Sequence, residues 1–179
     1  MTLSETRKLL VLQGRVVGAL VLREASATFG TTKIGYLWAV ITPAAGVGLL
    51  VAIFTVAVRH AAFGSSLALF FATGVLTLQF FNKLSNSLMS TFEANKALLK
   101  YPIIKATDTL YARAILVSAT YLVVMIFFYG ALIVAGLAEM PNNAEELPQA
   151  FLATVMLGFG FGTLNAVMVS FWDSWSNIE

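Results

Sequence analysis

The stretch that decides the fold is Gln13–Pro43, QGRVVGALVLREASATFGTTKIGYLWAVITP. It begins with a basic amphipathic segment, continues through separated glycines and aromatic residues, and ends in an uncharged apolar run. This order is typical of a membrane protein in which a helix on the membrane surface leads into the first transmembrane helix. A soluble domain has little use for such an arrangement.

The composition of the whole chain also indicates a membrane protein. Of its 179 residues, 59% are hydrophobic and only 11% are charged, whereas soluble domains average about 25% charged residues. So few charges cannot cover the surface of a soluble protein of this size, but lipid can cover an apolar surface. The net charge of +2 is too small to indicate nucleic-acid binding, and the lack of cysteine excludes disulfides and thiolate chemistry.

Four runs without charge are each long enough to cross a membrane, because about 20 helical residues span roughly 30 Å of hydrocarbon. The sequence therefore predicts an all-α integral membrane protein, with residues 1–179 forming a single transmembrane domain. The four predicted spans lie at about 36–58, 67–89, 112–137 and 148–171. The second helix is expected to start near Leu67, after a Gly-Ser-Ser segment.

Residues 1–35 are predicted to form an interfacial helix and a turn. Leu9–Leu22 is only 14 residues long and is interrupted by Arg15, so an in-plane amphipathic helix suits it better than a span. A poor fifth span is the alternative. The segment also imitates a secretory signal peptide, but Arg23 and Glu24 stand where an uncharged approach to the cleavage site is expected.

The entry into the membrane is assigned to Phe29–Trp38. We expect a turn there, because glycine gives the backbone freedom and aromatic rings anchor at the interface. The residues of this predicted entry motif are Gly30, Gly35, Tyr36, Trp38 and Pro43.

The distribution of cations predicts the orientation. With four spans, ten of the eleven Lys and Arg residues lie on one side, in the N-terminal segment and between the second and third spans. The positive-inside rule places that side, and with it the N-terminus, in the cytoplasm. The loop Glu139–Pro148 has three acids and no cation, as expected on the outer side.

The second span carries a polar stripe. Residues at steps of three or four share one face of a helix, and amides, hydroxyls and aromatic rings suit a hydrated sugar chain that slides past them. The predicted pathway residues are Gln79, Phe80, Asn82, Lys83 and Asn86. The alternative is a helix that leaves the membrane near Asn82, with Lys83 reaching the interface and the other polar groups simply hydrated.

The segment Lys96–Lys105 is short, basic and partly apolar, and Pro102 interrupts it. A protein that captured this loop would pull directly on both flanking helices. A loop that rests on anionic lipid headgroups is the other interpretation.

The sequence contains no catalytic or metal-binding pattern. His60 is the only histidine, no Walker phosphate loop occurs, and no paired carboxylates stand at helical spacing inside a span. We therefore expect no catalytic residue, no metal ion and no cofactor in this chain. In the fourth run, Gly158–Gly162 contains a G-x-x-x-G pattern that close helix packing explains, and Asn165 needs a partner on another helix.

These residues resemble a known family, the inner-membrane permeases of capsular polysaccharide exporters, which are a branch of the ABC-2 transporters. The order of the motifs over roughly 160 residues carries the resemblance more than any single motif. The matching motifs are Gln13–Val16, Leu22–Glu24, Phe29-Gly30, Gly35–Trp38, Pro43, Asp108–Arg113 and the region of Asp173 and Trp175.

The resemblance implies a transport subunit of the bacterial inner membrane, not an enzyme. Two permease copies would pair with two separate ATPase subunits that hold ATP and Mg, and a lipid-anchored acidic glycan would be exported. Periplasmic and outer-membrane export proteins would carry the glycan outward in Gram-negative cells. Membrane lipids are the remaining expected partner, and no nucleic acid is expected.

The resemblance further implies that the N-terminal helix and the loop between spans two and three dock on the ATPase. The residues assigned to this coupling are Arg15, Arg23, Glu24, Lys96, Lys100, Tyr101, Pro102, Lys105, Asp108 and Arg113.

Two positions depart from the family pattern. Similar proteins usually have Arg at the position of Thr28 and Glu at the position of Thr42, so the sequence does not determine the cargo. O-antigen, teichoic acid or a small molecule on the same scaffold is the alternative, and a non-transporting membrane protein is the third possibility. Since the family has six spans and four are predicted here, we expect the sequence to be a fragment without about its last third.

Overall fold

The computed structural model describes residues 3–29, 33–57, 66–138, 140–141, 143–172 and 175. Across these ranges the regular structure consists of helices: α1 (Leu3–Phe29), α2 (Lys33–Val56), α3 (Leu67–Met89), α4 (Thr91–Ala94), the short 3-10 helix η1 (Leu98–Lys100), α5 (Ala106–Val134) and α6 (Glu146–Phe171). By length and composition α3, α5 and α6 can each cross a membrane, and α2 contains a shorter apolar stretch, Ile41–Phe54. The chain is therefore an all-α membrane protein.

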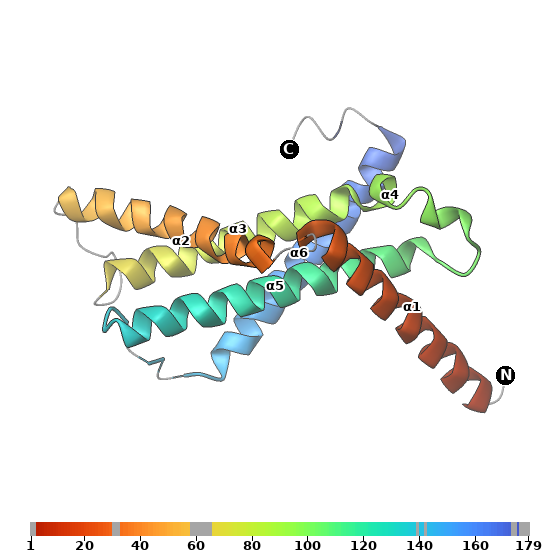
Figure 1. Ribbon diagram of the computed structural model, residues 1–179, viewed down its shortest axis with the longest axis horizontal. Coiled ribbons are helices and arrows are strands. Elements are labelled where there is room, and N and C mark those ends of the chain that lie inside the picture. Colours follow the sequence, from red (N-terminus) through yellow and green to blue (C-terminus); the bar gives the residue numbers. More distant parts are fainter. Residues whose placement is uncertain are drawn as a thin grey trace.

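Helix α3 lies at the centre of the bundle, where it packs against α2, α5 and α6 (Figure 1). Helix α1 packs mainly against α5, and its N-terminal part extends away from the other helices. The segment that contains α4 and η1 lies at one end of the bundle, and the connection from α5 to α6 lies at the other.

Local capping explains where α3 and α5 begin. Helix α3 starts at Leu67, where the sequence placed it, because the Ser66 hydroxyl accepts a hydrogen bond from the Leu69 amide at 3.2 Å. Helix α5 starts at Ala106, six residues before the predicted span, because the Asp108 carboxylate accepts a hydrogen bond from the Lys105 amide at 3.1 Å.

The N-terminal helix is longer than the sequence indicated. Helix α1 has 27 residues, not the 14 of Leu9–Leu22, and residues 33–38 of the expected turn Phe29–Trp38 already form the start of α2. Arg23 and Glu24 near the end of α1 do not stop the helix, because they find partners in Asn95, just after α4, and Arg113 on α5. Gly30 lies outside the described residues, as does the side chain of Tyr36.

Pro43 lies inside α2, well after the helix start. Proline has no amide hydrogen, so it cannot donate the usual helical bond to the carbonyl of Ala39. One residue earlier, the Thr42 hydroxyl donates to the carbonyl of Trp38 at 2.9 Å. The backbone of α2 is therefore weakest in the turn that these residues form.

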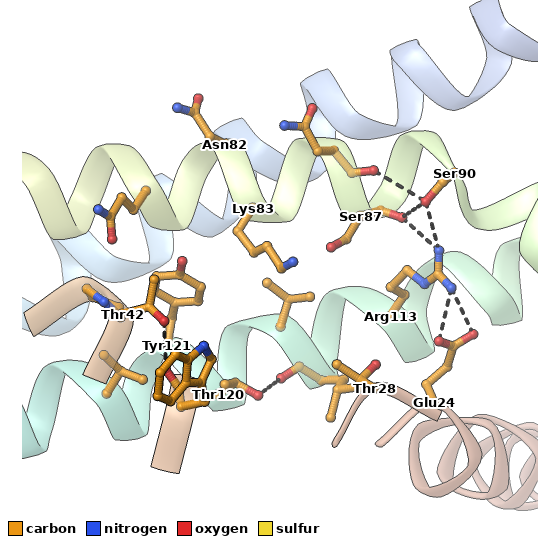
Figure 2. Close-up of a pocket in the computed structure, with 17 residues that line it drawn as sticks. Glu24, Thr28, Thr42, Asn82, Lys83, Ser87, Ser90, Arg113, Thr120 and Tyr121 are labelled. Carbon is orange, nitrogen blue, oxygen red and sulfur yellow. Dashed lines mark hydrogen bonds and ion pairs between the residues drawn. The ribbon is translucent and has the colours of Figure 1, made fainter. Parts of the chain in front are cut away.

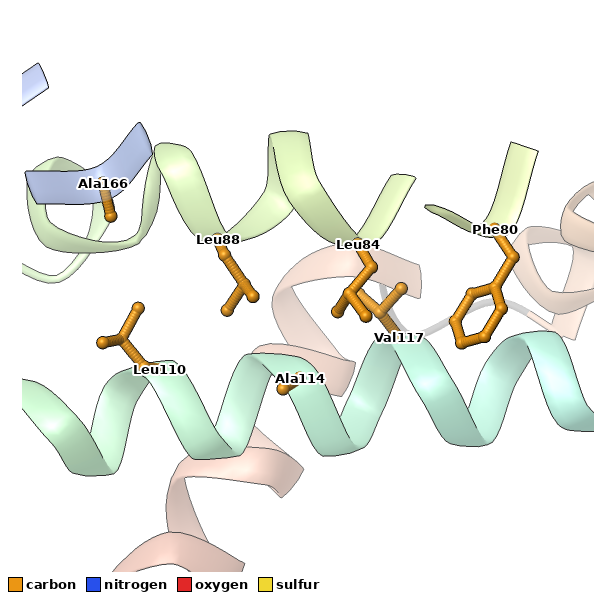
Figure 3. Close-up of a cluster of buried hydrophobic side chains, with 7 residues drawn as sticks. All are labelled: Phe80, Leu84, Leu88, Leu110, Ala114, Val117 and Ala166. Carbon is orange, nitrogen blue, oxygen red and sulfur yellow. The ribbon is translucent and has the colours of Figure 1, made fainter. Parts of the chain in front are cut away.

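Two apolar clusters hold the bundle together through one face of α3. Every fourth residue on this face is fully buried, namely Leu76, Phe80, Leu84 and Leu88. The larger cluster joins α3 to α5 and α6 (Figure 3) and consists of Phe80, Leu84, Leu88, Leu110, Ala114, Val117 and Ala166. The smaller one joins α3 to α2 and to the end of α5, through Val47, Ala68, Ala72, Leu76 and Leu132.

Helix α6 approaches α3 most closely at two glycines. A Cβ atom added at Gly162 would lie 2.7 Å from the Cβ of Leu88 and 3.0 Å from the Cα of Ser85. At Gly158 it would lie 2.9 Å from a methyl group of Leu84. The G-x-x-x-G pattern thus serves helix packing, as the sequence indicated.

Asn165 has the interhelical partners that its position in an apolar helix requires. It is buried, its amide nitrogen donates to the Ser85 hydroxyl at 3.4 Å, and its amide oxygen accepts from the Trp175 indole at 3.2 Å. The bond to Ser85 ties α6 to α3, and the bond from Trp175 ties α6 to the segment that follows it. Both satisfy polar groups that lipid could not.

We expect Gly162→Ala to destabilise the bundle by about 1–3 kcal/mol, because the new methyl group would overlap the α3 backbone, which cannot rotate away. Gly160→Ala is the matched control, since a Cβ there meets nothing within 4 Å. Reversible unfolding of both variants in mixed micelles measures the difference. Equal stability of the two variants would show that α3 and α6 are not in close contact.

Candidate functional site

A cavity of about 760 Å³ lies between α1, α2, α3 and α5. Its volume is within the range of about 300–1,000 Å³ that is usual for ligand pockets. Figure 2 shows its lining residues, which are Glu24, Thr28, Trp38, Thr42, Pro43, Gln79, Asn82, Lys83, Asn86, Ser87, Ser90, Arg113, Leu116, Val117, Thr120, Tyr121 and Val124. Most of them are polar, although they lie between helices that are largely apolar.

Helix α3 provides the most polar wall of this cavity. Four of the five residues that the sequence assigned to a pathway line it, namely Gln79, Asn82, Lys83 and Asn86. They face the cavity because steps of three and four residues keep them on one side of the helix. Farther along α3, Ser87 and Ser90 extend the same wall.

The assignment of Phe80 to this wall is wrong. Phe80 is fully buried and stacks on Tyr121 and Phe151, with ring centroids 5.1 Å apart in each pair. Successive side chains of a helix point about 100° apart, so Phe80 faces the core although Gln79 faces the cavity. Tyr121 is the aromatic residue of α5 that lines the cavity.

Helices α1 and α2 also contribute to the lining of the cavity. Trp38, 65% exposed, lines the cavity together with Pro43. Thr28 and Thr42, the two positions that depart from the family pattern, line it as well. Of the predicted entry motif, Trp38 and Pro43 therefore contribute to the cavity.

An ion pair lies at one end of the cavity. The Arg113 guanidinium binds both carboxylate oxygens of Glu24, at 3.0 and 3.2 Å, with side chains only 14% and 9% exposed. Its other terminal nitrogen donates to the Ser87 carbonyl at 3.0 Å and to the Ser90 hydroxyl at 3.2 Å. Arg113 on α5 thus joins α1 and α3 at a single point, as Figure 2 shows.

Asn95 extends this network to the segment after α4. It is 1% exposed and donates to Glu24 at 3.1 Å, while its amide oxygen accepts from Arg23 at 2.7 Å. Asn95 could not be chosen from the sequence, because its partners Arg23 and Glu24 lie more than 70 residues away. The sequence signal for Asn95 is weak: an amide side chain shortly after a predicted membrane helix.

A second polar contact joins α1 to α5, where Gln13 donates to Asp108. Asp108 is 1% exposed and also caps α5. Helix α1 is therefore fixed to α5 at two places, one on each side of its middle. The residues between them on α1 include the buried Leu20.

The residues assigned to ATPase coupling fall into two groups. Four of them bind other parts of the chain, namely Arg23, Glu24, Asp108 and Arg113. Glu24 and Asp108 are buried, so neither can meet a partner protein directly in this state. The other six are exposed: Arg15, Lys96, Lys100, Tyr101, Pro102 and Lys105.

The cavity offers mainly hydrogen-bonding side chains and one ion pair. In the described part of the chain, no three His, Cys, Asp or Glu residues come together as metal ligands. The one carboxylate among the residues that line the cavity, Glu24, is held in the ion pair with Arg113. An all-helical membrane protein with a polar chamber between its helices is the class that the fold and the site define.

Comparison with known proteins identifies the relatives. No family model matches the chain. It is 31% identical over 152 residues to the polysialic acid transport protein KpsM of Escherichia coli, and this match covers 85% of the chain and 59% of the relative. The capsule polysaccharide export inner-membrane protein CtrC of Neisseria meningitidis is 27% identical over 86% of the chain and 58% of its own length. BexB of Haemophilus influenzae, another such protein, is 26% identical over 94% of the chain and 64% of its own length.

The chain is thus related to capsule polysaccharide export proteins of the bacterial inner membrane, and the resemblance seen in its motifs is confirmed. It spans less than two thirds of the length of these relatives.

We expect Glu24→Gln to release the end of α1, because it leaves the Arg113 charge partly buried without a counter-charge. Removing one partner of a buried pair costs about 3–5 kcal/mol, and this pair, which is partly exposed, should fall at the lower end. Hydrogen exchange of the α1 amides near residues 20–29 measures the release. Arg15→Gln is the control, since Arg15 is exposed. The exchanged pair Glu24→Arg with Arg113→Glu should restore part of the protection, and unchanged exchange in Glu24→Gln would contradict the role of the ion pair.

Proposed function

We propose that this chain is the membrane-spanning permease subunit of an ATP-driven exporter that moves capsular polysaccharide, as a lipid-anchored glycan, from the cytoplasm across the inner membrane. The similarity to capsule export proteins supports this function. The single observation that carries it is the polar face of α3, which lines a cavity although α3 is long and apolar enough to span the membrane.

The chemistry of the cavity suits a sugar chain. Side-chain amides can donate and accept hydrogen bonds at once, so they can exchange one hydroxyl group for the next as a glycan moves. The exposed ring of Trp38 and the ring of Tyr121 can stack on sugar faces. Transport in this manner makes and breaks no covalent bond in the cargo.

A separate ATPase subunit, with its ATP and Mg, would supply the energy. The exposed loop between α4 and α5 is the proposed docking surface, where Tyr101 is 62% exposed and Ile103 is 67% exposed among lysines. The loop leads directly into α5, which carries Arg113. A movement of the loop would therefore reach α1 and α3 through the Arg113 contacts.

We further propose that two copies form the pathway and that the α4 to α5 loop faces the cytoplasm together with the N-terminus. The cavity of one copy is open, so a second copy is the simplest way to close it. The cation distribution supports the orientation. Periplasmic and outer-membrane export proteins would receive the glycan.

A second candidate is an ABC-2 permease for another cargo, such as O-antigen, teichoic acid or a small molecule. The observation that favours it is the place of Thr28 and Thr42 on the cavity wall. Uncharged residues there change the surface that a cargo meets.

The first test is co-purification. We expect a tagged full-length protein, extracted from native membranes, to bring down an ATPase with a Walker motif in a fixed ratio to itself. Mass spectrometry of the complex identifies the subunit and its ratio. A protein that purifies without an ATPase under conditions that preserve other exporters would contradict the proposal.

The second test concerns coupling. Lys100→Glu and Lys105→Glu should each lower the ATPase activity of the assembled complex several-fold without blocking membrane insertion, because an acidic side chain would repel an acidic docking surface. Glu145→Lys is the control, since Glu145 is exposed directly before α6, away from the loop between α4 and α5. If ATP hydrolysis survives both reversals at the wild-type rate, the loop is not the docking surface.

A further inference from the structure

The charges that line the cavity do not balance. Three charged side chains line it, namely Glu24, Lys83 and Arg113. Glu24 and Arg113 neutralise each other in their ion pair. Lys83 has no ion-pair or hydrogen-bond partner within the described ranges, and its side chain is exposed in the cavity. The described lining therefore carries one uncompensated positive charge.

Lys83 lies in a part of the chain where a positive charge is unfavourable. It lies two turns before the end of α3, in a helix that is long and apolar enough to span the membrane. A cation in such a helix is unfavourable unless water or an anion compensates it. In Figure 2 the side chain points away from α3 toward the space between α3 and α5. The amine is thus directed into the cavity.

The neighbours of Lys83 are hydrogen-bond donors that suit an anion. Gln79 lies four residues before it and Asn86 three residues after it, so all three share one face of α3. The side-chain amides of Gln79 and Asn86 can therefore donate hydrogen bonds to the same anion that Lys83 attracts. A hydrogen bond from a charged donor to a carboxylate or phosphate is roughly twice as strong as a neutral one.

We propose that Lys83, with Gln79 and Asn86, forms a subsite for one anionic group, a carboxylate or phosphate, carried by the cargo. That the anion belongs to a cargo rests on the proposed export function. The same chemistry occurs in an acidic sugar of the glycan and in the phosphate of a lipid headgroup, and the experiment separates these sources.

The test uses the full-length protein in nanodiscs of phosphatidylcholine. The probes are a hexasaccharide of alternating glucuronate and N-acetylglucosamine, and the same hexasaccharide after reduction of its carboxyl groups. Trp38 lines the cavity, so tryptophan fluorescence reports binding. We expect the acidic probe to bind about 10-fold more tightly, which corresponds to about 1.4 kcal/mol, because only its carboxylate can accept a charge-assisted hydrogen bond from Lys83.

Lys83→Gln should abolish this preference and Lys83→Arg should retain it, because charge and not shape creates it. Lys96→Gln is the matched control, since Lys96 is exposed and does not line the cavity. In a second arm, native mass spectrometry counts retained phosphatidylglycerol after nanodiscs that contain it are disrupted. Loss of retained lipid in Lys83→Gln, without any preference between the oligosaccharides, assigns the anion to a lipid headgroup and supports the subsite.

The subsite is overturned if neither the oligosaccharide preference nor the retained lipid depends on Lys83. This failure differs from failure of the export function. Equal binding of both oligosaccharides, with lipid retention that does not depend on Lys83, would remove the anion subsite and leave a glycan pathway. An intact preference in a protein without an ATPase partner would retain the subsite and remove the exporter.

Discussion

The ion pair between Glu24 and Arg113 is the interaction on which the cavity depends. Neither apolar cluster includes a described residue of α1, and this pair and the contact between Gln13 and Asp108 join α1 to α5. With α1 in place, Glu24 and Thr28 line the cavity. Glu24 and Arg113 also neutralise each other, so the positive charge of Lys83 is the remaining charge among the residues that line the cavity.

Much of the fold could be predicted from local patterns. Long apolar runs identify the membrane helices, and the step of three to four residues on α3 placed four polar residues on one wall. The partner of Glu24 could not be predicted, because Arg113 is 89 residues away and nothing in one sequence pairs them. The family resemblance implies a coupling role for both residues, and the structure adds the contact between them. The error at Phe80 arose because adjacency in sequence is not adjacency on a helix face.

Helix continuity near the N-terminus also depends on distant residues. Arg23 and Glu24 would end an apolar segment if they had to meet lipid, but Asn95 and Arg113 satisfy them and the helix continues to Phe29. The same contacts link the cavity to the segment that precedes the exposed loop. Binding in the cavity and movement of the loop would therefore act on one network.

The central claim is that the polar face of α3 meets a hydrated cavity inside the membrane, and cysteine accessibility tests it most directly. The chain has no cysteine, so Asn86→Cys and Leu78→Cys each introduce a single thiol. Asn86 lines the cavity, whereas Leu78 is 60% exposed and does not line it. A charged methanethiosulfonate reagent should modify Cys at position 86 much faster than at 78 in membrane vesicles, because thiolates form in water and not in lipid. Equally slow modification at both positions would contradict a hydrated cavity.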